Sequence, residues 1–177
     1  MRVTLIAAQS IDGFITRHDE SGTAFTSAAD KAYFTQVLAG FDCSVMGSTT
    51  YRTIRDMIRR QPPSPRRRVV LTRRPDDYAY ERIADLLEFR SDSPETILAR
   101  FSEAGCSECA LLGGSQIHHL FLDHDLVDRV WLTLEPRLFG RGTPFVAGEI
   151  DVRLSLESFE RLSDSDSLLV KYQVNRQ

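Results

Sequence analysis

The sequence has 177 residues, the length of one ordinary domain, with 42% apolar residues, 27% charged residues and a net charge of −3. This composition excludes disordered, fibrous and linker proteins, and apolar runs such as residues 3–8 are far below the roughly 20 residues that cross a bilayer. No secretory signal pattern follows Met1, so we expect a cytoplasmic protein that does not bind membranes.

The N-terminal region predicts a strand, a loop and a helix. Residues 3–8 form an apolar run typical of a buried strand, and the polar residues 9–26 indicate a loop. Ser27 is a suitable N-cap, and Asp30 follows three residues later in the pattern of a capping box. Apolar residues at helical spacing continue from there to Gly40, where we expect the helix to end.

A second strand and helix follow, and then a strongly basic window. Residues 43–46 predict a strand, which Gly47 closes before a helix that hydroxyl side chains can cap. A proline-rich loop is expected at 62–65 and a strand at 68–72. Nine arginines and one acid lie in residues 52–74, a charge of +8, which favours a small polyanion as ligand or a nucleic acid. The negative charge of the whole chain argues against the nucleic acid.

The C-terminal half predicts alternating helices and strands. Ser93 is the expected N-cap of a helix that Gly105 stops, a strand follows at 109–112, and a further helix begins at Ser115. Residues 129–135 alternate as a strand does, and the runs 152–162 and 168–174 predict an antiparallel pair. This order predicts an α/β fold of three layers, with a mixed, mostly parallel sheet that ends in an antiparallel hairpin.

Parallel sheets of this kind bind ligands at the carboxyl ends of their strands, and three turns there favour anions. Each also has a purely structural explanation: a tight glycine turn, ordinary helix capping and solvated arginines. Together they predict a ligand with several phosphates, and a dinucleotide fits better than a mononucleotide, although neither GxGxxG nor the P-loop motif is present. The three turns consist of Gly113, Gly114 and Ser115; Gly47, Ser48, Thr49 and Thr50; and Thr72, Arg73 and Arg74.

Cysteines and histidines give weaker signals. The three cysteines make an odd number, and we interpret the pair Cys106 and Cys109 as buried thiols and not as a metal site. His118 and His119 are adjacent in the last predicted helix, so we expect one to face the core and the other to face solvent, with no catalytic role.

The order and spacing of several motifs resemble dihydrofolate reductase over nearly the whole chain. The motifs are Leu5 to Ala8, Asp12 and Ile15, then Ala29, Asp30 and Ala32 to Phe34, then Gly47, Thr50 and Tyr51, then Gly113 and Gly114. Ser10 to Gly13, Leu126 to Asp128 and Pro136 to Phe145 are more similar to the reductase domain of riboflavin biosynthesis, the RibD C-terminal domain, and to its stand-alone relatives.

The resemblance implies a single domain over residues 1–177 that binds NADPH along the sheet edge. The pyrophosphate would lie on the turn from Gly113 through Ser115 to Gln116 and on the helix from Thr49, with the nicotinamide near Ala8 and Ile15. The adenosine 2′-phosphate would reach Thr72, Arg73 and Arg74. Ser48 fills a position where dihydrofolate reductases usually have Arg, so a preference for NADPH over NADH depends on Arg73, Arg74 or Arg52.

The implied reaction is hydride transfer to a pyrimidine-like or pterin-like substrate, with a proton supplied to the neighbouring heteroatom. Asp30 and Asp12 are the candidate acids, and Gln9 and Phe34 the candidate substrate contacts; a capping box would equally explain Asp30, and an Asp-Gly turn Asp12. The zinc deaminase signature is missing, so if this chain reduces the pyrimidine intermediate, its deaminase is expected to be a separate protein. A stand-alone reductase of undefined substrate is an equal alternative.

Alternatives remain dihydrofolate reduction, a nucleotide-binding module without turnover, and a nucleic-acid binder that uses the basic window. A homodimer is expected by analogy, with Trp131 or the last hairpin at its interface.

Overall fold

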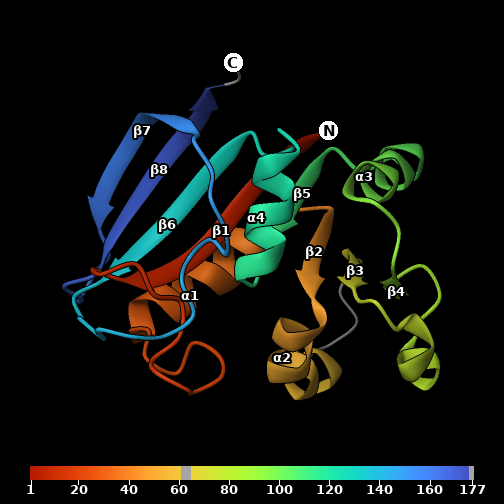
Figure 1. The fold of residues 1–177 in the computed structure, drawn as a ribbon, viewed down its shortest axis with the longest axis horizontal. Coiled ribbons are helices and arrows are strands. Elements are labelled where there is room, and N and C mark those ends of the chain that lie inside the picture. The colour runs from red at the N-terminus through yellow and green to blue at the C-terminus, as the bar shows by residue number, and fades with distance from the viewer. Residues whose placement is uncertain (61–64, 176–177) are drawn as a thin grey trace.

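The computed structural model describes residues 1–60 and 65–175, which form one eight-stranded sheet with helices on both faces (Figure 1). The proline-rich loop expected at 62–65 falls almost wholly outside these residues. The strands are β1 (Arg2–Ser10), β2 (Cys43–Gly47), β3 (Arg67–Leu71), β4 (Leu87–Arg90), β5 (Glu108–Leu111), β6 (Arg129–Glu135), β7 (Arg153–Arg161) and β8 (Leu168–Asn175). The helices are α1 (Ala28–Leu38), α2 (Ser48–Arg60), α3 (Pro94–Glu103) and α4 (Ser115–Asp123), with a 3₁₀ helix η1 (Pro75–Glu81).

The strand order is β4-β3-β2-β5-β1-β6-β8-β7. Neighbouring strands from β4 to β6 pair in parallel, and β8 pairs antiparallel with both β6 and β7. The predicted mixed sheet with a C-terminal antiparallel hairpin is therefore confirmed. Because the first six strands are parallel, their carboxyl ends lie along one edge of the sheet.

Alternating side chains divide the core between the two faces of the sheet. Val3, Leu5 and the residues that share their face pack under α3 and α4. Ile6 and its neighbours pack under α1, and a separate cluster around Tyr51 packs under α2 and η1 on that same face. None of the helices in the described ranges is both long and apolar enough to span a membrane.

Several boundaries differ from the sequence expectations. β1 continues through Gln9 and Ser10, which we expected in the loop, because both residues pair with β6. η1 and β4 were not predicted at all. β4 has only four residues, and only Leu87 and Phe89 are buried in it, so its alternating pattern is too short to stand out from a loop.

Candidate cofactor and substrate site

Two of the predicted anion-binding turns meet at the edge of the sheet. The Gly47 N–H donates to the Gly113 carbonyl oxygen over 2.7 Å, which joins the end of β2 to the turn after β5. A Cβ placed on Gly114 would lie 3.5 Å from Thr50 Oγ1 and 4.0 Å from the Ile15 side chain. The two turns and the loop that carries Ile15 are therefore neighbours at the carboxyl-end edge of the sheet.

The helices that begin at these turns have no acidic residue in their first turn. This holds for α2 and α4, whereas α1 and α3 each carry one, Asp30 and Glu95. Gly114 is the N-cap of α4 and supplies no side-chain cap, and the buried Ser115 hydroxyl has no partner among the described residues. The positive ends of both helix dipoles are thus free of internal carboxylates and suited to an external anion.

Close packing requires glycine at Gly113. Its φ of +82° is unfavourable for other residues, and a Cβ there would lie 2.5 Å from His118 Nε2. The His118 ring is buried below this turn, with Nδ1 2.7 Å from the Phe145 carbonyl oxygen, and burial lowers its pKa to about 4. His118 therefore faces the core as expected and is neutral near pH 7, which does not suit acid catalysis. The other histidine, His119, is only partly exposed, because its Nδ1 is buried.

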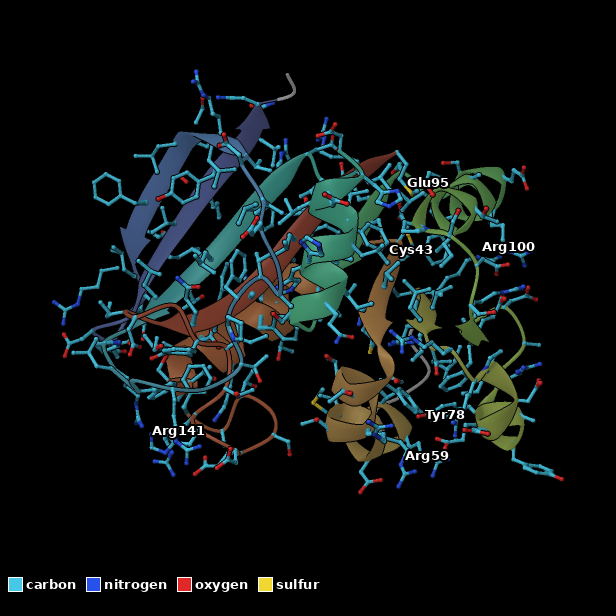
Figure 2. All side chains as sticks on the ribbon, in the orientation of Figure 1. Cys43, Arg59, Tyr78, Glu95, Arg100 and Arg141 are labelled. Carbon is cyan, nitrogen blue, oxygen red and sulfur yellow. The ribbon has the colours of Figure 1, made fainter. Side chains whose placement is uncertain are left out.

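Most arginines of the basic window are used within the protein. Arg55 and Arg59 of α2 bind Glu81, at 3.5 and 3.1 Å, and the Tyr51 hydroxyl donates to the same carboxylate over 2.6 Å. Arg52 of α2 also donates to the hydroxyl of Tyr78. Figure 2 shows Arg59 on α2 and Tyr78 on η1, the two elements that these contacts connect. These contacts fasten η1 to α2.

Arg73 and Arg74 differ from the other arginines of the window. They lie just after β3, beside the start of α2, and both are exposed. Within the described residues, neither guanidinium has a hydrogen bond or an ion pair, so both are available to a ligand. Thr72 precedes them, and its hydroxyl accepts the Arg74 backbone N–H over 3.2 Å, which shapes the turn.

Asp30 lies on the opposite face of the sheet from α4, and its carboxyl is not used in a capping box. The Ser27 hydroxyl does accept the Asp30 backbone N–H, over 3.1 Å, as predicted. The reciprocal bond is absent, because the Ser27 N–H donates instead to Glu135 Oε1 over 2.8 Å. The Asp30 side chain, 8% exposed, faces the hydroxyls of Thr133 and Thr26. Burial raises the pKa of Asp30, and the Glu135 charge adds to this effect.

Asp12 holds a loop. Its carboxylate accepts the Phe139 and Gly140 N–H groups, at 2.9 and 2.7 Å, and the Ser10 hydroxyl at 2.6 Å. The Ser10 hydroxyl and these backbone donors hold the pKa of Asp12 below its ordinary value. The Thr16 and Thr143 hydroxyls join the same two loops over 3.0 Å. Asp12 is therefore a fixed carboxylate that binds residues 137–148 to the loop after β1.

The two expected substrate residues lie on different faces. Phe34 is half-buried on α1, one helical turn after Asp30, and packs against the cluster around Ile6. Gln9 is half-buried in β1, where alternation directs it to the face covered by α4. Ala8, by contrast, pairs with Thr133 and shares the face of Asp30.

Sequence reasoning missed Thr133, Glu135 and Ser167, all buried near the start of α1. A signal existed: Thr133 and Glu135 are two polar residues at alternating positions of a strand with buried neighbours. The three free cysteines, Cys43, Cys106 and Cys109, lie away from this edge at the amino ends of β2 and β5, two buried and one half-buried. The described residues contain no cluster of metal-ligating side chains.

Comparisons with solved structures reveal the same architecture in three other proteins. A putative riboflavin biosynthesis protein from Shewanella sp. PV-4 is 23% identical, with a TM-score of 0.75 over 99% of this chain and 100% of the other. A deaminase and 5-amino-6-(5-phosphoribosylamino)uracil reductase from Thermotoga maritima is 19% identical, with a TM-score of 0.77 over 98% of this chain and 56% of the other.

The third structure is dihydrofolate reductase from Enterococcus faecalis in complex with NADP(H), 21% identical, with a TM-score of 0.70 over 99% of this chain and 97% of the other. At the sequence level, residues 1–166 match the family described as RibD C-terminal domain. The chain belongs to the RibD C-terminal domain family and has the dihydrofolate reductase-like fold.

Proposed function

We propose that this protein is an NADPH-dependent reductase that transfers a hydride to a pyrimidine- or pterin-like substrate of the riboflavin-pathway type. RibD C-terminal domains are NADPH-dependent reductases, which gives the reaction class. The observation that carries the proposal for this chain is the meeting of two helix N-termini without acidic residues, α2 and α4, at the edge where Asp30 lies buried.

The residues at this edge fit a dinucleotide. The pyrophosphate is assigned to the turn from Gly113 to Gln116 and to the start of α2 at Thr49 and Thr50, where Gly114 carries no side chain beside Thr50. The nicotinamide is assigned to the space near Ala8 and Ile15. When bound, NADPH supplies the hydride.

Two exposed arginines suit the adenosine 2′-phosphate. Arg73 and Arg74 lie beside Thr72, neither guanidinium is paired within residues 1–60 and 65–175, and a guanidinium binds a phosphate through two parallel hydrogen bonds. Arg52 already bonds Tyr78 and Thr49, so its charge is partly used. Ser48 carries no charge, and the preference for NADPH over NADH therefore rests on Arg73 and Arg74.

Asp30 is the proposed proton donor. A donor must hold its proton near neutral pH and release it to the substrate, and burial favours the protonated form of Asp30. Phe34, one turn further along α1, offers an aromatic surface to a flat heterocycle next to that carboxyl. Gln9 is assigned a supporting contact from the other face of β1. Asp12 is ionised and bonded to backbone, so its proposed role is to shape the loop over the nicotinamide.

A homodimer is the proposed assembly. Every residue of β7 is exposed, and Leu154, Leu156 and Phe159, the last 67% exposed, share a face that continues into the core under β8. A two-fold pair of such faces would bury them against each other. Leu156→Glu should convert the dimer to a monomer in light scattering, whereas Ser155→Glu, on the other face, should not. A monomeric wild-type protein would refute this assembly.

Nicotinamide fluorescence tests the central proposal. The protein should bind NADPH and oxidise it when pterin or ribosylaminopyrimidine substrates are supplied. Arg73→Ala should weaken NADPH at least tenfold while NADH binding stays unchanged, since only NADPH carries the 2′-phosphate. Arg82→Ala is the matched control, because Arg82 is an exposed arginine at the far end of η1. Equal losses for both cofactors would show that the 2′-phosphate lies elsewhere, and binding without oxidation by any substrate would favour a nucleotide-binding module.

A further inference from the structure

Glu135 is a buried carboxylate at the last position of β6, 2% exposed. Its Oε1 accepts the Ser27 N–H and its Oε2 accepts the Ser167 hydroxyl, both over 2.8 Å. Ser167 lies next to the turn between β7 and β8, and its own N–H donates to the Ser165 hydroxyl. Among the described residues no lysine, arginine or histidine forms an ion pair with Glu135, so neutral donors alone hold it.

Glu135 accepts the hydrogen bond from the N-cap residue of α1 that the local sequence pattern assigns to Asp30. In a capping box, the acid three residues after the N-cap accepts the N-cap N–H. Here the Ser27 N–H is taken by Glu135, from a strand more than a hundred residues away along the chain. The Asp30 carboxyl is consequently released from the backbone of its own helix and directed toward Thr133 and Thr26.

The two carboxyl groups are neighbours across one residue. The Ser27 N–H donates to the Glu135 carboxylate, and the Ser27 hydroxyl accepts the backbone N–H of Asp30. Thr133, which faces the Asp30 carboxyl, stands two positions before Glu135 and on the same face of β6. The other charged or titratable groups that face Asp30 are Lys31 and Tyr33 of its own helix. Lys31 is exposed, whereas Glu135 is buried and its charge acts on Asp30.

We propose that Glu135 is a positioning residue for Asp30: it caps α1 in place of Asp30, and its negative charge favours a proton on the Asp30 carboxyl. Two like charges in a buried site do not both ionise readily, and a backbone N–H donates to Glu135, whereas Asp30 faces only side-chain hydroxyls, which can rotate. The catalytic meaning of this assignment rests on the proposed function of Asp30 as proton donor, whereas the electrostatic part does not.

Glu135→Gln tests the electrostatic part directly. Glutamine keeps an acceptor for the Ser27 N–H and removes the charge, so carbon-13 NMR of the Asp30 carboxyl in the protein without substrate should show its titration about one pH unit lower. Glu160→Gln is the matched control, because Glu160 of β7 is a carboxylate near Tyr33 without a bond to Ser27. It should leave the Asp30 titration in place. An unchanged or raised titration in Glu135→Gln would overturn the proposal, whatever the enzyme reduces.

Two further readouts separate this proposal from a structural role and from the proposed function. Ser167→Ala removes the hydroxyl that bonds Glu135, Ser27 and Ser165 and keeps the charge of Glu135, so it should lower stability without lowering the Asp30 titration. An equal shift in both variants would overturn the proposal. Where Asp30 donates the proton, the fall of kcat at high pH should move down with the NMR titration; a kcat profile that stays fixed while the titration moves would refute donation by Asp30 and leave the electrostatic assignment intact.

Discussion

The N-terminus of α1 and those of α2 and α4 carry the same partial positive charge but are filled in different ways. At α1 the protein supplies its own carboxyls, Asp30 in the first turn and Glu135 from β6. At α2 and α4 the first turns contain no acid, and glycine replaces a side-chain cap at α4. A helix end that is already neutralised has little attraction left for a phosphate, whereas an open one attracts it. The contrast supports the proposed assignment of proton transfer to the start of α1 and of the anionic cofactor to the starts of α2 and α4.

The largest effect is expected at α1. Asp30→Asn should lower kcat at least 100-fold, the lower range for loss of a general acid, and leave NADPH affinity within about twofold. Because the folded pKa of Asp30 is raised, its ionisation opposes folding once the pH rises above its ordinary value, so the Asn variant should also unfold at a higher temperature at pH 7. Turnover and a thermal melt measure both. A loss of NADPH binding in this variant would break the division between the two ends.

Acid should change the stability contributed by His118, below the α4 turn, and by Asp30, at the start of α1, in opposite directions. The folded pKa of His118 under the α4 turn is about 4, below the ordinary 6.5, so the unfolded chain binds more protons between these values. Stability from this group is present above pH 6.5 and falls by about 3 kcal/mol as the pH drops to 4. Asp30 acts in the other direction, since its raised pKa favours the folded state as the pH falls. Urea unfolding of the wild type and His118→Asn at pH 7 and pH 4.5 measures the difference; an equal pH dependence in both proteins would contradict it.

A carboxylate introduced in the first turn of α4 should neutralise the positive end of that helix, as carboxyls do at α1, and so weaken the binding of an anion. Gln116 is exposed at the second position of α4, and Gln116→Glu should weaken NADPH about tenfold by repulsion of the pyrophosphate. The same charge stabilises the helix, so the melting temperature should stay equal or rise. Gln173→Glu, exposed on β8, is the control for added charge. Titration of nicotinamide fluorescence gives the affinities, and an unchanged Gln116→Glu value would remove α4 from the cofactor site.

The smallest effect is expected at Asp12. Asp12→Asn keeps the shape but weakens the bonds to the Phe139 and Gly140 N–H groups, so the loop should loosen and kcat/KM should fall a few fold. Hydrogen exchange of residues 137–148 should increase at the same time. A loss as large as that of Asp30→Asn would mean that Asp12 takes part in the proton transfer after all.

Local patterns were sufficient to predict most elements and the positions of the turns at the carboxyl ends of β2, β3 and β5. Ser27 and Ser93 start helices, and Gly113 and Gly114 separate a strand from a helix, because caps and tight turns depend on neighbours in the chain. The partner of the Ser27 N–H could not be predicted, since Glu135 reaches it only after β6 is placed beside β1.

The free charge of the basic window, residues 52–74, could not be predicted from the sequence either. Counting arginines overestimated the free positive charge, because Glu81 lies in a 3₁₀ helix that the sequence did not reveal, and it binds Arg55 and Arg59. The position of Arg73 and Arg74 directly after β3 was predictable, because it depends only on where a buried strand ends. Their lack of partners among the described residues depends on the tertiary structure and could not be predicted from the local sequence.

The bonds from Asp12 to Phe139 and Gly140, and from Thr16 to Thr143, make the loops after β1 and β6 a single structural unit. A change of length or conformation in one loop strains the other, so selection for a new substrate acts on both at once. Grafting one loop from a relative with another specificity should therefore give a poorly ordered site, and moving the pair together should carry the specificity with it.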